Sequence, residues 1–373
     1  MNKNSAGIGF YCSSLSWGGL EMNLLRRAEW LSQRGWKTTV LCVENSPIDT
    51  EARRKSLNVI NIRRNFKYCD IVNALRVERI LKKNRINLLW IRDTRDISIA
   101  SLVKRIFNVK VIYQQAMQIG VNKRDFFHTV RFSAIDAWIS PLKFLANQVV
   151  KKTRFDAKKI HIVPLGVDVE KLIGKKISRS NARRILNVPD SGKIIGVIGR
   201  IDPLKGQLFL IEALRKLRDG GMNLNLLIVG EPTKDEGEEF FNFIKRRTHE
   251  LNLDKNVFFR PFRQDVEIFY RAIDIFALPS KGETYGTVTI EAMIFGLPII
   301  ATDSGGTPEI LEHGRLGFLY PPDDEEKFFE KIKWMVANED EVKKIASLAK
   351  QTAREKYSHI TECKKLEEII EKL

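Results

Sequence analysis

The chain has 373 residues and 63 Lys and Arg against 46 Asp and Glu, which gives a formal net charge of +17. With 43% hydrophobic and 29% charged residues, it is neither a disordered chain nor a collagen-like fibre. Its length exceeds the roughly 100–200 residues of a typical domain, so two domains are expected. No apolar run approaches the ~18 residues of a membrane-spanning helix, and the N-terminus leads into a short apolar strand rather than a signal sequence. We therefore expect a soluble, cytoplasmic protein.

The positive charge is concentrated in the first half of the chain. Residues 1–170 hold 30 basic and 14 acidic residues, whereas residues 171–373 hold 33 and 32. This asymmetry predicts a polyanionic partner or surface for the first half, and a solvated basic face that only aids solubility is the alternative. The pair Lys123-Arg124 lies beside Phe126 and Phe127, which indicates peripheral contact with anionic lipid.

Strands and helices are expected to alternate along both halves. In the first half, the expected strands are Ile8–Cys12, Thr38–Val43, Val59–Ile62, Leu88–Ile91, Val109–Tyr113, Trp138–Ser140 and Ile160–Val163. Helices are expected over Glu21–Arg34, before Gly35, and over Ile71–Lys83. In the second half, the expected strands are Ile194–Ile198, Leu226–Val229, Val257–Phe259, Ile275–Leu278 and Ile299–Ala301. This alternation predicts two α/β domains, each a doubly wound parallel sheet with helices on both faces.

The domain boundaries follow from polar and turn-forming stretches. The segment from Pro164 to Asp168 and the polar stretch 171–187 are expected to form a hinge. The expected domains are 1–168 and 169–356, with a charged amphipathic helix over 357–373 that packs back on the first. The four cysteines, at positions 12, 42, 69 and 363, lack zinc or redox spacing and are expected to be buried, reduced thiols.

The loop after the strand Ile194–Ile198 carries a motif that suits phosphate. Ligands of open parallel sheets bind beyond the carboxyl ends of the strands, so loops at these ends are where chemistry is expected. Gly199 and Gly206 bracket this loop, and Arg200 and Lys205 supply two cations close to a helix N-terminus. An ordinary loop with two surface cations is the alternative.

A second motif follows the strand Ile275–Leu278. Glu283 falls in the loop and Glu291 in the following helix, whose first backbone amides, from Gly286 to Val288, suit an anion. A carboxylate accepts two hydrogen bonds from a vicinal diol, as found in sugars and ribose. Pairs of glutamates at this separation also arise by chance, so the spacing alone does not indicate a site. The glycine at the helix start, which the pair brackets, is what favours a binding site here.

These motifs and several others occur in an order that resembles a known family. The matching segments are Gly18-Gly19, Ser140, Val163 to Asp168, Gly199-Arg200, Lys205-Gly206, Gly230, Leu278 to Ser280, Glu283, Glu291 to Met293, Gly305 to Glu309 and Gly317-Phe318. Along nearly its whole length the chain resembles glycosyltransferase family four, the retaining sugar-nucleotide enzymes of the GT-B fold, in which two Rossmann-like domains face each other.

The resemblance implies a role for each matching residue. It implies that Arg200 and Lys205, in the donor-binding loop that begins at Gly199, hold the diphosphate. It also implies that Glu283 touches the donor sugar and that Glu291 holds the ribose. The residues implied in β-phosphate contact through their backbone are Tyr285, Gly286, Thr287 and Val288. Gly18 and Gly19 would let the N-terminal loop close against donor and acceptor, and Phe262 and Arg263 would lie near the base. The catalytic set is thus Glu283, Arg200 and Lys205.

One position departs from the family pattern. Many members carry a His after the strand corresponding to Val109–Tyr113, where this chain has Gln114 and Gln115 on the acceptor side. Glutamine orients a hydroxyl or phosphate but is not a base, which favours a mechanism in which the leaving phosphate takes the acceptor proton. No two Asp residues are separated by a single residue, so the metal-binding Asp-x-Asp of other glycosyltransferases is missing, and no metal or other cofactor is expected.

The leading interpretation is metal-independent, retaining transfer of a hexose from a nucleotide-diphospho-sugar to a glycan or lipid-linked acceptor. It places the protein in cell-surface polysaccharide or glycolipid biosynthesis, at the inner face of the membrane. A sugar-nucleotide epimerase or phosphorylase of the same fold and a catalytically dead scaffold are alternatives. From a different class, a basic nucleic-acid-binding protein is a further alternative, although the chain shows no DNA- or RNA-binding module, so no nucleic-acid partner is expected.

Overall fold

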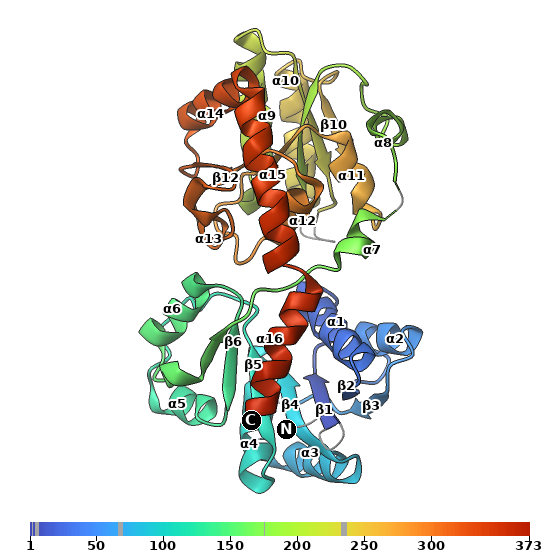
Figure 1. Ribbon diagram of the computed structural model, residues 1–373, viewed down its shortest axis with the longest axis vertical. Coiled ribbons are helices and arrows are strands. Elements are labelled where there is room, and N and C mark those ends of the chain that lie inside the picture. Colours follow the sequence, from blue (N-terminus) through green and yellow to red (C-terminus); the bar gives the residue numbers. More distant parts are fainter. Residues whose placement is uncertain (2, 4–6, 66–69, 175, 233–236) are drawn as a thin grey trace. The chain divides into compact units, whose positions relative to one another are not determined.

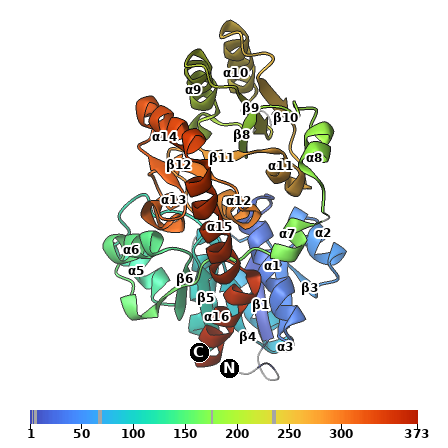
Figure 2. The same ribbon diagram turned by 45° about the horizontal axis from the view of Figure 1, so that its top comes forward.

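The computed structural model divides the chain into two compact units, which we call the first and the second unit (Figures 1 and 2). It describes residues 1, 3, 7–65, 70–174, 176–232 and 237–373. The first unit comprises Met1–Pro164 together with His359–Leu373, and the second comprises Leu165–Ser358. The chain therefore leaves the first unit and returns to it with its last helix, and the two divisions lie near the expected positions 168 and 356.

The first unit is built on a seven-stranded sheet in which every strand pairs in parallel. Its strands are β1 (Gly7–Cys12), β2 (Lys37–Val43), β3 (Val59–Ile62), β4 (Ile86–Ile91), β5 (Lys110–Gln114), β6 (Ala137–Ser140) and β7 (Ile160–Ile162), in the order β3-β2-β1-β4-β5-β6-β7. All seven expected strands are present, and their ends lie within two residues of the expectation.

Helices cover both faces of this sheet. They are α1 (Gly19–Gln33), α2 (Pro47–Arg54), α3 (Ile71–Lys83), α4 (Ile97–Ile106), α5 (Phe126–Phe132), α6 (Lys143–Lys152) and α16 (His359–Lys372), with short 3-10 turns η1 (Thr94–Asp96) and η2 (Ala157–Lys159). Successive strand residues point to opposite faces, so Phe10 packs with the side chains of α1 and α16, whereas Tyr11 packs with those of α3 and α4. Both core clusters are buried, as a doubly wound sheet requires.

The second unit repeats the architecture with a six-stranded parallel sheet. Its strands are β8 (Lys193–Ile198), β9 (Leu224–Val229), β10 (Val257–Arg260), β11 (Ile275–Leu278), β12 (Ile299–Thr302) and β13 (Phe318–Tyr320), in the order β10-β9-β8-β11-β12-β13. The helices are α7 (Val169–Ile173), α8 (Arg179–Ile185), α9 (Gln207–Asp219), α10 (Glu238–Glu250), α11 (Val266–Ala272), α12 (Thr287–Phe295), α13 (Thr307–Ile310), α14 (Glu325–Ala337) and α15 (Glu339–Lys356), with 3-10 turns η3 (Pro203–Lys205) and η4 (Glu312–Gly314). The expected fold class, two doubly wound parallel-sheet domains, is confirmed.

Three local expectations were wrong. The edge strand β13 was not expected, because its three residues lie directly between Gly317 and Pro321, residues that are typical of loops. The polar stretch 171–187 is not a continuous hinge: it contains α8, which begins at Arg179 after the capping residue Ser178. The final helix begins at His359 rather than at position 357, because Tyr357 ends α15 and its carbonyl accepts a hydrogen bond from the Val167 amide.

The remaining expectations concern cysteines and membrane spans. Cys12, Cys42 and Cys363 are buried free thiols, and burial raises the pKa of Cys42 to about 12, whereas Cys69 lies outside the described residues. Among the helices that the structure describes, none has the length and apolar character needed to cross a bilayer.

Candidate functional site

The expected phosphate-binding motifs lie together at the carboxyl edge of the second unit's sheet. The loops after β8, β11 and β12 leave three strands that are neighbours in the sheet. The Lys281 amide donates to the Leu204 carbonyl at 3.1 Å, and the Gly306 amide donates to the Glu283 carbonyl at 2.8 Å. Backbone hydrogen bonds therefore join the three loops into one surface.

Two glycines allow these loops to approach so closely. Gly206 has φ +74°, and a Cβ there would lie 2.6 Å from the Pro279 carbonyl oxygen. Gly305 has φ +63°, and a Cβ there would lie 2.1 Å from the Glu283 carbonyl oxygen. Any larger residue would push the loops apart, which explains why glycine occupies both positions.

Lys205 and Glu283, which are far apart in the sequence, form an ion pair in this surface. Lys205 Nζ lies 2.7 Å from Glu283 Oε2, and both side chains are partly exposed. Arg200 pairs with Asp202 at 2.9 Å, and its side chain is 56% exposed. The guanidinium is thus held at one side yet remains open to a ligand, and the two cations and one carboxylate expected at this site share one edge of the sheet.

The helix α12 begins in the same surface. Gly286 is its N-cap with φ +73°, so the backbone amides of the first turn, from Thr287, are directed toward the loops. Tyr285 is 6% exposed, and its hydroxyl donates to the Leu165 carbonyl at 2.8 Å, so its side chain anchors the loop. The buried hydroxyl of Ser280 has no hydrogen-bond partner among the described residues.

Glu291 lies one turn into α12 and is oriented by a residue that the sequence did not indicate. The hydroxyl of Tyr270, from α11, donates to Glu291 Oε2 at 2.7 Å and lies 3.3 Å from the Val288 carbonyl oxygen. Burial, followed by the Glu291 charge, raises the pKa of Tyr270 well above its ordinary value, so it stays a donor. Tyr270 belongs to no motif, and only its position in the folded chain identifies it.

Phe262 and Arg263 come from a different part of this edge. They follow β10, the edge strand, and are separated from β11 by β9 and β8 in the sheet. Phe262 is 64% exposed, and Arg263 pairs with Asp265 at 2.7 Å. An exposed ring of this kind is available to stack on a planar base.

The glycine loop of the first unit lies between β1 and α1. Gly18 is the N-cap of α1 and donates its amide to Glu21 Oε2 at 3.0 Å, while Gly19 is the first helical residue. At the start of the same loop, the Ser13 amide and hydroxyl both donate to the Asp96 carboxylate. Burial raises the pKa of Asp96 to about 7, so this carboxyl titrates near neutrality, a feature that no sequence signal revealed.

Gln114 and Gln115 are buried inside the first unit. Gln114 Oε1 accepts hydrogen bonds from Trp90 and Arg92, and its amide donates to Glu362 at 3.4 Å. Gln115 Oε1 accepts from Trp138 at 3.2 Å and from the Ser140 hydroxyl at 3.0 Å, and its amide donates to the Met117 carbonyl. Both amides are therefore engaged within the unit, and their expected role toward an acceptor stays a prediction.

The site residues thus fall into two groups, one in each unit. The second unit brings together Arg200, Lys205, Glu283, Gly286 and Glu291, and the first unit holds Gly18, Gly19, Gln114 and Gln115. Across the described parts of both units, no group of three or more His, Cys, Asp or Glu side chains is arranged to hold a metal ion.

Comparisons with known proteins match both units to one family. The family model described as Glycosyltransferase Family 4 matches residues 17–171, and the model described as Glycosyl transferases group 1 matches residues 178–352. A curated D-inositol 3-phosphate glycosyltransferase of Corynebacterium urealyticum is 33% identical over 221 residues, 58% of this chain and 51% of the relative. One of Stackebrandtia nassauensis is 31% identical over 232 residues, 60% of this chain and 52% of the relative. The match thus spans about half the length of these curated relatives.

Solved structures share the whole architecture. A glycosyltransferase from Rickettsia africae aligns over 99% of this chain and 98% of its own with a TM-score of 0.89 at 22% identity. HepE of Anabaena, solved in complex with UDP-glucose, aligns over 98% of this chain and 100% of its own with a TM-score of 0.80 at 20% identity. At these identities the likeness concerns the fold. Because family models match both units and the two parallel-sheet domains match this architecture, the chain belongs to glycosyltransferase family 4 and has the GT-B fold.

Proposed function

We propose that the protein transfers a hexose from a nucleotide-diphospho-sugar to a glycan or lipid-linked acceptor, with retention of configuration and without a metal ion. The observation that carries this proposal is the Lys205–Glu283 pair, which lies beside the N-terminus of α12 at the carboxyl edge of the second sheet. The HepE structures were solved with UDP and UDP-glucose, which supports a nucleotide-sugar as the donor.

The charges of this edge suit a leaving nucleoside diphosphate. Its diphosphate gains negative charge as the glycosidic bond breaks, and the cations Arg200 and Lys205 together with the α12 amides would stabilise that charge. Arg200 offers a planar donor fork, whereas Lys205 offers a point charge that exchanges Glu283 for a phosphate. Released from Lys205, the Glu283 carboxylate would accept hydrogen bonds from the sugar hydroxyls.

Glu291 would bind the ribose of the donor. Its carboxylate is oriented by a hydrogen bond from the Tyr270 hydroxyl, and a carboxylate is a suitable acceptor for the two hydroxyls of a vicinal diol. Phe262 would stack on the base from the exposed loop after β10. These contacts hold the nucleotide equally in the ground and transition states, so they serve binding rather than the bond-breaking step.

The proton of the acceptor would move to the leaving group. The acceptor oxygen forms a bond to the anomeric carbon on the face from which the diphosphate departs, and the bond between that carbon and the phosphate oxygen breaks. The phosphate oxygen takes the proton of the acceptor hydroxyl, so atoms and charge balance without a protein base. The glutamines at 114 and 115, in place of a histidine, agree with this route.

The acceptor would be bound by the first unit, close to a membrane surface at the cytoplasmic face. The loop before α5 exposes Met117, Val121 and Arg124, and Phe126, the first residue of α5, is 83% exposed. An apolar and basic surface of this kind suits the interface of an anionic membrane. Such a location agrees with a lipid-linked acceptor in cell-surface polysaccharide or glycolipid synthesis.

The test combines donor binding, transfer and metal removal. Sugar nucleotides with different bases are screened for thermal stabilisation, where a ligand at 100 times its Kd adds about 2.7 kcal/mol. With the donor found, Arg200→Ala and Lys205→Ala should each lower transfer by about 10²–10³-fold, as the loss of one preorganised donor does. Lys333→Ala, an exposed change on α14, serves as the control.

EDTA should leave the wild-type rate unchanged. Dependence on added Mg²⁺ or Mn²⁺ would contradict the metal-free mechanism, and stabilisation by no sugar nucleotide would contradict the function itself. Conversion of the donor to its epimer without transfer would favour the epimerase alternative.

A further inference from the structure

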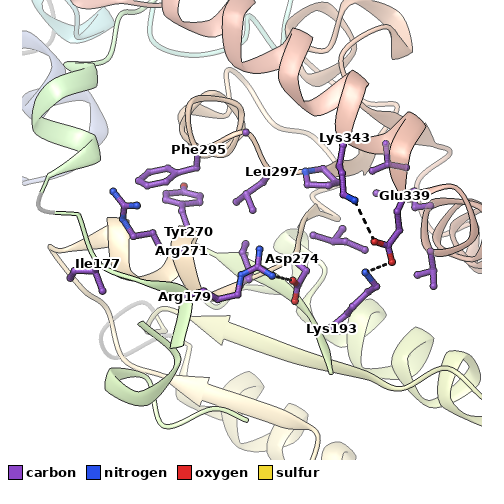
Figure 3. Close-up of a pocket in the computed structure, with 17 residues that line it drawn as sticks. Ile177, Arg179, Lys193, Tyr270, Arg271, Asp274, Phe295, Leu297, Glu339 and Lys343 are labelled. Atoms are coloured by element: carbon purple, nitrogen blue, oxygen red, sulfur yellow. Dashed lines mark hydrogen bonds and ion pairs between the residues drawn. The ribbon is translucent and has the colours of Figure 1, made fainter. Parts of the chain in front are cut away.

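Two adjoining cavities of the second unit lie apart from the loops of the site described above, although Tyr270 also lines the first of them, and the two cavities differ in charge. The first, of about 410 Å³, lies beneath the start of β8 and β11 and is drawn in Figure 3. Apart from Arg271, its lining cations have acidic partners: Arg179 pairs with Asp274 at 2.7 Å, and Lys193 and Lys343 both pair with Glu339. Most of the positive charge in this first cavity is therefore neutralised by its own side chains.

The second cavity, of about 460 Å³, has cations but no acidic residue in its lining. We call it the cationic groove, and its charged lining residues are Lys176, Arg271, Lys350 and Arg354. It adjoins the first cavity, because Ile177, Arg271 and Phe295 line both. The volume lies within the range of about 300–1,000 Å³ that is usual for small-molecule sites.

These cations are not neutralised by the protein. Among the described residues, Lys176, Lys350 and Arg354 form no ion pair. Arg271 donates to the Ile173 carbonyl at 3.1 Å and lies over the Phe295 ring at 5.4 Å, while its buried Nε has no hydrogen-bond partner. In Figure 3, Arg271 and Phe295 lie side by side.

The arrangement costs free energy unless an anion is bound. Lys350 and Arg354 are four residues apart on α15, where like charges share one helix face and repel each other. Arg271 and Lys176 add two further positive charges at the same groove. A bound anion would convert this mutual repulsion into charge-assisted hydrogen bonds.

The groove is distinct from the proposed donor site. Its floor includes Ile294 and Phe295 at the C-terminal end of α12, whereas the donor site lies at the N-terminal end, at Thr287. Nine helical residues span about 13 Å, so one ligand phosphate does not reach both ends.

We propose that the cationic groove is a second anion site that binds a compound carrying a phosphate or diphosphate group. The phosphate oxygens would accept hydrogen bonds from the four cations of the groove. A less polar part of the ligand would pack against Ile294 and Phe295. The phosphate can belong to a soluble compound or to a lipid headgroup, which share this chemistry.

The experiment uses the full chain with Arg200→Ala and Lys205→Ala as a background, so that the proposed donor site contributes little phosphate binding. On this background, Lys350→Ala with Arg354→Ala removes two groove cations. The matched control, Lys333→Ala with Lys344→Ala, removes two exposed cations from α14 and α15 outside the groove. Binding of inorganic pyrophosphate is measured by calorimetry, and binding to phosphatidate vesicles by flotation.

We expect the groove variant to bind at least one of the two probes about tenfold or more weakly than the control, as the loss of charge-assisted hydrogen bonds requires. Weaker binding of pyrophosphate would identify the ligand as a soluble phosphate compound. Weaker binding of the vesicles alone would identify it as a lipid headgroup. Equal binding of both probes by groove variant and control overturns the proposal.

The melting temperature without ligand is measured to detect misfolding. Removal of two mutually repelling cations should leave it unchanged or slightly higher, so a lower value would indicate a folding defect. This test measures binding and does not measure sugar-nucleotide transfer. The outcome of the test is therefore independent of the proposed function.

Discussion

Glu283 and Glu291 occupy the same edge of the second unit, but their partners differ. Glu283 pairs with the partly exposed side chain of Lys205, whereas Glu291 accepts a hydrogen bond from the buried hydroxyl of Tyr270. A carboxylate with a flexible, partly exposed lysine as its partner can exchange that partner as charge develops, and one with a buried partner offers the same contacts throughout. The two residues should therefore affect different kinetic constants.

We predict that Glu291→Gln mainly raises the KM for the donor, because uniform binding is lost. Glu283→Gln should lower kcat more than it raises KM, because its contact is made as positive charge develops at the sugar. Steady-state kinetics of both variants distinguish the roles, with the exposed Glu250→Gln as control. The opposite pattern would mean that the two roles are exchanged.

Asp96 gives the first unit a pH-dependent stability. Its pKa is raised by burial to about 7, so between its unfolded value near 3.8 and pH 7 the folded state holds a proton that the unfolded state has lost. Stability should therefore fall as the pH rises through this window, by at most about 1.4 kcal/mol per pH unit, and level off above it. Melting temperatures from pH 4 to 8 should show this slope in wild type and lose it in Asp96→Asn. An identical slope in both proteins would exclude Asp96 as its source.

At the scale of elements, α16 is held to the first unit by charged contacts. Arg27 of α1 pairs with Glu362 at 2.8 Å, and both side chains are fully buried. Glu367 accepts hydrogen bonds from Trp36 at 3.0 Å and from Arg34. Burial by itself would raise the pKa of Glu367, but the bonds from Arg34, Lys3 and Trp36 lower it to about 2.

Loss of the buried partner should destabilise the first unit. Glu362→Ala leaves the Arg27 guanidinium buried without its carboxylate, and breaking such a pair costs about 3–5 kcal/mol. Glu368→Ala, an exposed change on the same helix, should cost little. Urea unfolding of the two variants measures the difference, and equal midpoints would show that the buried pair does not hold the helix.

At the scale of the whole molecule, the charge asymmetry agrees with the proposal that the two units bind different partners. The first unit carries the excess of positive charge and exposes apolar side chains in and before the first turn of α5, whereas the second holds the proposed donor site. A membrane-bound acceptor would meet the basic unit, and a soluble donor would meet the other.

We predict that the protein sediments with anionic vesicles at low salt and dissociates as salt is raised, because each cation near the surface contributes about 1 kcal/mol. Phe126→Ser should weaken vesicle binding about tenfold, since a fully buried Phe contributes about 1.5–3 kcal/mol. Phe243→Ser, at an exposed position of the second unit, is the control. Equal recovery with neutral and anionic vesicles at low salt would contradict membrane contact.

The sequence by itself determined the two-domain parallel-sheet fold, most strand positions and the loops that carry the motifs. These features depend on local patterns: apolar β-branched runs, helix periodicity, and glycines where backbones approach, as at Gly206 and Gly305. Local motifs marked Lys205 and Glu283 as candidates separately, and the family resemblance implied that they share a site; the common carboxyl edge of parallel strands explains why they do lie together.

Only the tertiary structure decided which side chains contact each other. It brought Tyr270 to Glu291, enclosed Gln114 against Glu362 from the last helix, and buried Asp96 beneath Ser13. These contacts join residues whose separation in sequence carries no periodic signal. They depend on the path of the whole chain and on the burial it creates, and burial is what turns an ordinary carboxyl such as Asp96 into one that titrates near neutrality.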